Sequence, residues 1–277
     1  MTEEAASAFV PGHVTGFFSV HRAEDPSRSG SRGAGVALSD GVSVTVTPAA
    51  DRSIVFEGEP VGMDAPEGVL DALNVNARVT VATDLPLGTG FGVSGASALG
   101  TALAANAAFE EDYTENDLIG LAHTTEVEAG TGLGDVVAQA RGGVPLRLEP
   151  GGPDAGTLDG VPTAGRIEYL SFGSLATSEV LGGGTEELTD AGERALVELL
   201  EEPTIERFVH SSRRFAREAG LLTSQVETAI KDVSAHGGEA AMAMLGETVF
   251  ALGTGLSDAG YDPAVCSIYP PGAALLD

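Results

Sequence analysis

Polar and hydrophobic residues alternate along several short stretches of the chain, and this pattern predicts β-strands. In "GVSVTVTPAA" (41–50), valines fall on every second position, which places them on one face of an extended strand. "RSIVFEG" (52–58) follows closely enough to be the hairpin partner of that strand. Further strands are predicted at residues 76–86, 142–150, 166–172 and 264–270.

Longer stretches between these strands predict α-helices. One begins after Thr114, which with Asp117 forms a plausible cap for a helix over residues 115–129. Pro203 suits the first turn of a later helix, and Gly246 interrupts the last one. The other helices are predicted at residues 96–109, 189–201, 203–219, 223–236 and 239–253. Both halves mix strands and helices without regular βαβ alternation, so we expect an α+β fold rather than a doubly wound sheet.

A domain boundary is predicted in the middle of the chain. The stretch "GGPDAGTLDGVPTAG" (151–165) is rich in Gly, Pro and Asp, a composition that favours loops over regular structure. We therefore expect one domain over residues 1–155 and a second over residues 156–277. The length of 277 residues and a hydrophobic content of 43% suit an α/β protein of one or two domains with a sizeable core.

The charge of the chain is strongly negative. It has 41 acidic residues against 14 basic ones, a net charge of -27, and Lys231 is its only lysine. A nucleic-acid partner is disfavoured, because such binding depends on Lys and Arg against phosphates. The acids are spread among apolar residues rather than gathered in a disordered tail. We expect a halophilic surface, since molar salt shortens the Debye length to about 3 Å and screens the repulsion.

Targeting and cysteine signals are few. No stretch approaches the roughly 18 consecutive apolar residues of a membrane span, and the N-terminus carries Glu3 and Glu4 without the basic region of a signal peptide. Cys266 is the only cysteine, which excludes an internal disulfide and a cysteine metal cluster. We expect a soluble cytoplasmic protein.

The glycine-rich stretch "PLGTGFGVSGASALG" (86–100) leads directly into an alanine-rich helix. Glycines let a ligand approach the main chain, and the amides at a helix start converge on an anion. This predicts a phosphate site, with a flexible glycine-rich turn as the alternative. The stretch is not a P-loop, because no lysine follows its glycines. It is not a dinucleotide-binding fingerprint either, because the predicted helix is followed by another helix instead of a strand. The Ser94 hydroxyl, at the helix start, could also reach a metal ion.

This stretch resembles the second motif of the GHMP kinases, the superfamily of galactokinase, homoserine kinase and mevalonate kinase. That motif reads roughly P-x-x-x-G-L-G-S-S-A-A. Phe91, Val93 and Gly95 stand where the motif has leucine, its first serine and its first alanine. The resemblance implies a loop that wraps the phosphates of ATP and a Ser94 that helps to hold Mg²⁺. The residues it assigns to nucleotide binding are Pro86, Gly88, Gly90, Gly92, Val93, Ser94, Gly95 and Ala96.

Other stretches extend the resemblance over nearly the whole chain. "FVPGHVTGFF" (9–18) has the frame of the first motif, with His13 where a common version has lysine, and "MAMLGETVFALG" lies where the third motif is expected. "SGSRGAGVAL" and "GTGLGDVVAQARGG" complete a set that resembles the branch of the superfamily phosphorylating pantoate. The resemblance implies the GHMP kinase fold: an N-terminal domain like the ribosomal S5 domain 2 and a ferredoxin-like C-terminal domain.

The resemblance also implies a catalytic and a metal-binding residue. Asp135 in "GTGLGD" lies where such kinases carry an aspartate base, and would orient or deprotonate the 4-hydroxyl of pantoate. Its alternative role is the N-cap of a helix beginning at Val136. Ser94 and Glu126 would hold Mg²⁺, which prefers oxygen ligands. Glu128 lies about 200° around the helix from Glu126 and is expected in solvent, and Glu126 could itself be an ordinary surface glutamate.

Pantoate carries a carboxylate, for which arginine offers two parallel hydrogen bonds. Arg32 in "SGSRGAG" is the first candidate, followed by Arg22 and Arg141; a surface arginine balancing nearby acids is the alternative. His13 would contact a phosphate or the substrate, or be a packed structural histidine.

The resemblance is compatible with a homodimer. The rival functions are another small-molecule kinase of the superfamily, acting on homoserine, shikimate or mevalonate, and a nucleotide-binding regulator without turnover.

Overall fold

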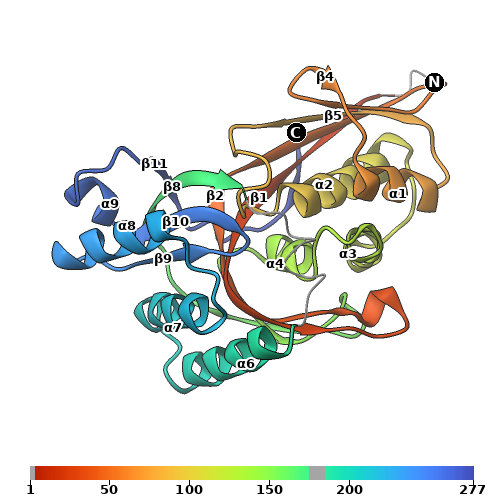
Figure 1. Ribbon diagram of the computed structural model, residues 1–277. Helices are drawn as coiled ribbons and strands as arrows, with labels where there is room; N and C mark the ends of the chain where they lie inside the picture. Colours follow the sequence, from red (N-terminus) through yellow and green to blue (C-terminus); the bar gives the residue numbers. More distant parts are fainter. Residues whose placement is uncertain (1–3, 175–184) are drawn as a thin grey trace.

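A long, bent β-hairpin runs through the computed structural model, which describes residues 4–174 and 185–277 (Figure 1). Its strands are β1 (Ala6–His21) and β2 (Gly30–Pro48), joined through the short 3-10 helix η1 (Pro26–Arg28). The predicted strand at 41–50 is thus the second half of a 19-residue strand. Both sheet faces of this hairpin are covered, so buried residues follow one another along it instead of alternating strictly.

The hairpin belongs to a sheet of eight strands with the order β12-β1-β2-β5-β3-β4, to which β6 adds on β2 and β7 on β6. The remaining strands are β3 (Ser53–Phe56), β4 (Glu59–Pro60), β5 (Ala77–Thr83), β6 (Val144–Glu149), β7 (Thr157–Val161) and β12 (Ala274–Leu276). The predicted hairpin between residues 41–50 and 52–58 is wrong: β2 pairs with β5, and β3 pairs parallel to β5. A parallel pair needs a crossover, which the overlooked helix α1 (Asp64–Ala72) supplies.

Helices α2 (Val93–Ala108), α3 (Glu115–Ala129) and α4 (Asp135–Arg141) lie together on one side of the hairpin (Figure 1). The predicted start of α3 is confirmed, because the Thr114 and Asp117 side chains form a reciprocal capping box. Small residues let α2 approach the sheet closely: a Cβ atom at Gly100 would lie 2.5 Å from the side chain of Val44. Among the helices of residues 4–174 and 185–277, none combines the length and hydropathy needed to cross a membrane.

A second sheet has four antiparallel strands in the order β11-β8-β10-β9. Its strands are β8 (Arg166–Ser174), β9 (Ala240–Ala243), β10 (Gly246–Leu252) and β11 (Ala264–Ser267). Its helices are α6 (Glu186–Glu201), α7 (Ile205–Glu218), α8 (Ser224–Ala235) and α9 (Gly255–Asp258). Helices between β8 and β9, and again between β10 and β11, give the βαββαβ sequence of a ferredoxin-like unit. The predicted α+β fold class is confirmed.

The predicted helix over residues 239–253 is wrong, because this segment forms the antiparallel pair β9–β10. Alanine and methionine there have high helix propensity, and a short apolar run does not distinguish a buried helix from a buried strand. Pairing decides the outcome: β10 bonds to β8 along its whole length, and all four residues of β9 are buried. The predicted helix at 203–219 begins later, at Ile205, with Thr204 as its cap.

The predicted boundary stretch 151–165 contains strand β7. Because β7 pairs with β6, the chain passes from the first sheet to the second between Val161 and Arg166. The division into residues 1–155 and 156–277 stays a prediction.

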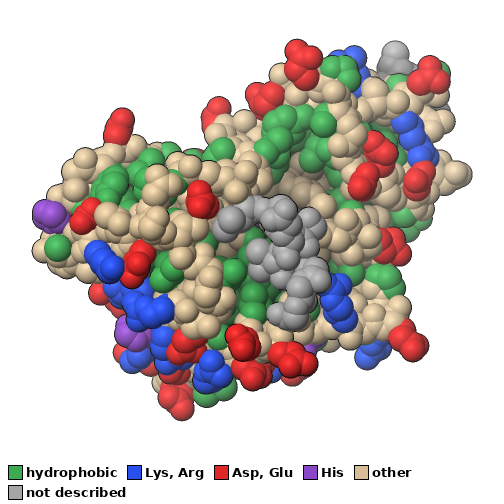
Figure 2. Space-filling model, in the orientation of Figure 1, with side chains coloured by type: hydrophobic (Ala, Val, Ile, Leu, Met, Phe, Trp, Pro, Cys, Tyr) green, Lys and Arg blue, Asp and Glu red, His purple; other side chains and the backbone are tan. Residues whose placement is uncertain are grey.

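Acidic side chains are spread over the visible face of the molecule, and the largest group of basic ones lies at its lower left (Figure 2). Four arginines of α6 and α7 each pair with glutamates nearby: Arg194, Arg207, Arg213 and Arg214. These arginines therefore balance local acids. That the acidic surface is suited to high salt stays a prediction.

Helix α6 lies directly against β1, and one glycine makes this contact possible. A Cβ atom at Gly192 would lie 2.0 Å from the carbonyl oxygen of Phe18 and 2.8 Å from the amide nitrogen of Ser19. We expect Gly192→Ala to lower the free energy of unfolding by about 3 kcal/mol, since backbone atoms cannot move aside cheaply. Gly165→Ala is the control, because no atom lies within 4 Å of that position. Urea unfolding measures both, and equal stability of the two variants would contradict the close contact.

Candidate active site

The glycine stretch folds into a loop that ends at the start of α2. Gly88, Gly90 and Gly92 have φ angles of 70°, 92° and 64°, in the left-handed region that other residues rarely adopt. Gly92 is the N-cap, so α2 begins at Val93, three residues earlier than predicted. A Cβ atom at Gly90 would lie 3.0 Å from the carbonyl oxygen of Met244. The loop therefore packs against the turn between β9 and β10.

The loop and the helix start line a cavity of about 170 Å³. The first helical hydrogen bond of α2 runs from the Ala96 amide to the Gly92 carbonyl, at 2.9 Å. The amides of the three residues in between precede this bond and have no helical partner, and the helix dipole adds positive potential there. Of the predicted nucleotide-binding residues, the cavity is lined by Gly88, Gly90, Gly92, Val93 and Ser94, but not by Pro86, Gly95 or Ala96.

Asp135 lies beside this loop, as the first residue of α4. It is not the N-cap of a helix beginning at Val136, because Gly134 takes that position. Its side chain is 26% exposed and lines the cavity. The carboxylate oxygen Oδ1 accepts hydrogen bonds from His13 Nδ1 at 2.7 Å and from Thr15 Oγ1 at 3.4 Å. Within the described part of the chain, Oδ2 has no hydrogen-bond partner, which leaves it for a ligand.

The Asp135 carboxylate is ionised at neutral pH. Burial raises its pKa, but the hydrogen bond from His13 and the positive charge of Arg147 lower it, and the pKa lies below its usual value. A carboxylate in this state can only accept hydrogen bonds. Asp135 therefore offers an acceptor for a hydroxyl group in the cavity.

Arg147, on β6, is a residue of the site that the sequence analysis missed. Its side chain is 2% exposed and lines the cavity. Nε donates to Ser31 Oγ at 3.1 Å, while the buried Nη1 has no partner within the described residues. Burial lowers its pKa to about 10, so it remains a cation at neutral pH. A buried cation with an unpaired N–H group is costly unless an anion takes it. The signal in the sequence is an arginine between two leucines of a predicted strand.

The structure brings the two predicted metal ligands together. Glu126 lies on α3 with 2% exposure, and Ser94 Oγ donates to its Oε2 at 3.0 Å. Glu128 is exposed, as predicted. Among residues 4–174 and 185–277, no cluster of three or more His, Cys, Asp or Glu side chains could hold a metal alone. One carboxylate and one hydroxyl suit Mg²⁺, which keeps waters and takes its other ligands from phosphates.

The pKa of Glu126 predicts a pH dependence of stability. Burial raises this pKa from 4.5 to about 7, although the hydrogen bond from Ser94 acts against it. The folded protein thus holds a proton that the unfolded chain loses as the pH rises above 4.5. We expect the contribution of Glu126 to the free energy of unfolding of the metal-free protein to fall by about 3 kcal/mol from pH 4.5 to 7.

Glu126→Gln removes the titrating group, so the variant should lack this fall. Urea unfolding of both proteins at a series of pH values and constant salt measures the difference. Equal slopes for the two proteins would show that Glu126 has an ordinary pKa.

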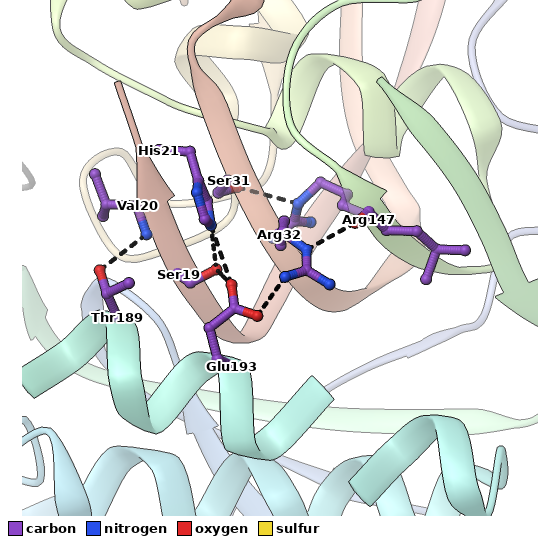
Figure 3. A network of polar contacts seen from close by, with 9 residues as sticks. Ser19, Val20, His21, Ser31, Arg32, Arg147, Thr189 and Glu193 are labelled. Atoms are coloured by element: carbon purple, nitrogen blue, oxygen red, sulfur yellow. Dashed lines mark hydrogen bonds and ion pairs between the residues drawn. The ribbon is translucent and has the colours of Figure 1, made fainter. Parts of the chain in front are cut away.

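Arg32 does not line the cavity. Gly33 pairs with Arg147 across β2 and β6, so Arg32, one residue away, lies on the opposite face from Arg147, while Ser31 shares its face. Figure 3 shows the Arg32 guanidinium pointing to Glu193 of α6, with which it forms an ion pair; its Nε also donates to the Leu148 carbonyl at 2.7 Å.

The other predicted substrate residues also lie outside the cavity lining. Arg22 is exposed just beyond the end of β1. His13 is fully buried behind Asp135 and reaches the site through that residue. The structure thus brings together Asp135, Ser94, Glu126 and the loop, and adds Arg147.

The fold and the site define a kinase of the GHMP type, and the sequence matches the GHMP kinases N terminal domain over residues 64–143. The chain is 35% identical to the pantoate kinase of Methanocaldococcus jannaschii over 275 residues, 94% of this chain and 99% of that protein. It is 37% identical to the pantoate kinase of Thermococcus kodakarensis over 262 residues, 88% of this chain and 86% of that protein. The chain belongs to the pantoate kinase family.

Solved structures agree with this assignment. A phosphotransferase related to the CoA biosynthesis pathway is similar with a TM-score of 0.86 and 32% identity, over 98% of each chain. A homoserine kinase from Cytophaga hutchinsonii has a TM-score of 0.71 at 16% identity, over 98% of this chain and 97% of the other. The second likeness supports the fold alone.

Proposed function

We propose that this protein transfers the γ-phosphoryl group of ATP to the 4-hydroxyl of pantoate, as a step in coenzyme A biosynthesis. One observation carries the proposal: a single cavity joins an open helix start, an ionised aspartate and a buried arginine with an unpaired N–H group. These are the groups that a phosphate, a hydroxyl and a carboxylate require. Pantoate carries the last two, and ATP supplies the first.

The glycine loop and the start of α2 would hold the phosphates of ATP through main-chain amides. Ser94 and Glu126 would hold a magnesium ion, which, when bound, neutralises charge on the phosphates. Their fit rests on the Ser94 hydroxyl, which lies 3.0 Å from the buried carboxylate of Glu126 at the loop. Asp135 would accept the proton of the 4-hydroxyl while that oxygen bonds to the γ-phosphorus and ADP leaves.

Arg147 would hold the carboxylate of pantoate. A Cβ atom at Gly134 would lie 2.7 Å from Arg147 Nε, so the guanidinium lies against the residue that precedes Asp135. The carboxylate and the hydroxyl of a small hydroxy acid would then bind to neighbouring residues, Arg147 and Asp135. Arg32, the first candidate from the sequence, stays the rival for this role.

The test is ADP release by the purified protein with ATP and Mg²⁺, in about 2 M KCl to screen the surface charge. Pantoate is compared with homoserine, mevalonate and shikimate, and we expect turnover with pantoate alone. Turnover with another acceptor would keep the kinase and change its substrate. Binding of ATP without turnover on any acceptor, by protein shown to be folded at that salt, would favour the regulator. Cytoplasmic location and a homodimer stay predictions.

A further inference from the structure

His13 is held between two groups that define its chemical state. Its ring is fully buried, and Nδ1 lies 2.7 Å from Asp135 Oδ1. The other ring nitrogen, Nε2, is buried and has no hydrogen-bond partner within the described residues. It lies directly over the backbone of Gly35, where a Cβ atom would be 2.1 Å away. The polar contacts of the ring are thus all on the Nδ1 side, where Thr15 Oγ1 also lies 3.4 Å from Nδ1, and the Nε2 side faces bare backbone.

This arrangement selects one tautomer. An ionised Asp135 can only accept a hydrogen bond, so the proton must be on Nδ1. A second proton on Nε2 would be buried without an acceptor, and burial lowers the pKa of His13. The ring is therefore neutral, with a proton on Nδ1 and a lone pair on Nε2.

The main chain of His13 makes a second connection. Its amide donates to the Phe91 carbonyl at 2.9 Å, and Phe91 lies in the phosphate loop between Gly90 and Gly92. One residue of β1 thus contacts both the loop and Asp135. Its side chain occupies Oδ1, which leaves Oδ2 as the oxygen available to a substrate hydroxyl.

We propose that His13 is a positioning residue, which as a neutral ring protonated on Nδ1 fixes the Asp135 carboxylate relative to the phosphate loop. This inference rests on the proposed role of Asp135 as acceptor of the hydroxyl proton. It assigns the proton transfer to Asp135 alone, because the buried ring does not line the cavity. The other polar or charged groups that act on Asp135 are Thr15, Arg147 and Glu126, and they are unchanged in the variants below.

The test compares His13→Asn with His13→Leu. The two side chains have nearly the same shape, but only the asparagine amide places a donor where Nδ1 lies. A hydrogen bond to a charged group predicts a fall in kcat of about 10- to 100-fold for His13→Leu and recovery of most of it in His13→Asn. The KM for ATP should change little. Equal kcat values for the two variants, at similar thermal midpoints, would overturn the inference.

Two further measurements separate positioning from packing. In an Asp135→Ala background, the difference between His13→Asn and His13→Leu should disappear; if it persists, His13 does not act through Asp135. Nitrogen-15 NMR of the wild-type ring, identified by its loss in His13→Asn, should show a proton on Nδ1 and none on Nε2 at neutral pH. The opposite tautomer or a doubly protonated ring would overturn the assignment.

The failures of the two proposals are distinguishable. A wild-type protein that does not phosphorylate pantoate contradicts the proposed function, while the NMR experiment still tests the state of His13. An active wild type whose two His13 variants are equal contradicts the inference and leaves the proposed function intact.

Discussion

Asp135→Asn is expected to lower kcat for phosphorylation of pantoate about 1,000-fold, while ATP still binds. The amide of asparagine cannot accept the hydroxyl proton, and loss of a positioned base typically costs about 100- to 10,000-fold. ADP release at saturating ATP and pantoate, and calorimetric titration with ATP in the absence of pantoate, measure the two effects.

The substitution also removes a negative charge beside the buried Arg147. Loss of a negative charge near a buried cation destabilises the folded state, so activity must be measured well below the thermal midpoint of the variant. Asp154→Asn, at an exposed aspartate, is the control for a change of one charge in so acidic a protein. A folded Asp135→Asn variant with kcat within about fivefold of wild type would remove Asp135 from the reaction.

The parts of the fold that the sequence predicts are those with local causes. Helix α3 has its capping box within its own first turn, and the glycine-rich loop before α2 owes its shape to its own glycines. The apolar residues of β9 and β10 fit a helix as well as a strand, and only the pairing of β10 with β8 and of β9 with β10 selects the strand. The partner of β3 depends likewise on the crossover helix α1, which the sequence does not predict.

The residues of the candidate site divide in the same way, into those with a local signal in the sequence and those placed by pairing between distant strands. Asp135, Ser94 and Glu126 lie in contiguous motifs, so a resemblance finds them without knowledge of the fold. Arg147 has no motif around it, and its burial follows from the register that pairs it with Gly33. Arg32 is adjacent to that glycine in the sequence, yet one residue of offset puts its side chain on the other face of the strand. Register between distant strands is tertiary information, which a single sequence does not contain.

Arg147→Met is expected to raise the KM for pantoate about 100-fold and to leave the KM for ATP within about threefold of wild type. Methionine fills much of the same volume, so the loss is that of a charge-assisted hydrogen bond to the carboxylate rather than of packing. Arg32→Met is the matched control. Its ion pair with Glu193 is partly exposed and contributes less than about 1 kcal/mol to stability, so the KM for pantoate should not change.

The reverse result, a raised KM for pantoate in Arg32→Met and not in Arg147→Met, would show that Arg32 binds the carboxylate, as the sequence indicates. A substrate analogue decides whether the effect is electrostatic. The amide of pantoate has no negative charge, so wild type and Arg147→Met should use it with similar KM values. If Arg147→Met raises the KM for the amide as much as the KM for pantoate, the substitution has altered the shape of the cavity. The charge of Arg147 would then have no part in recognition, because a neutral ligand would feel its removal equally.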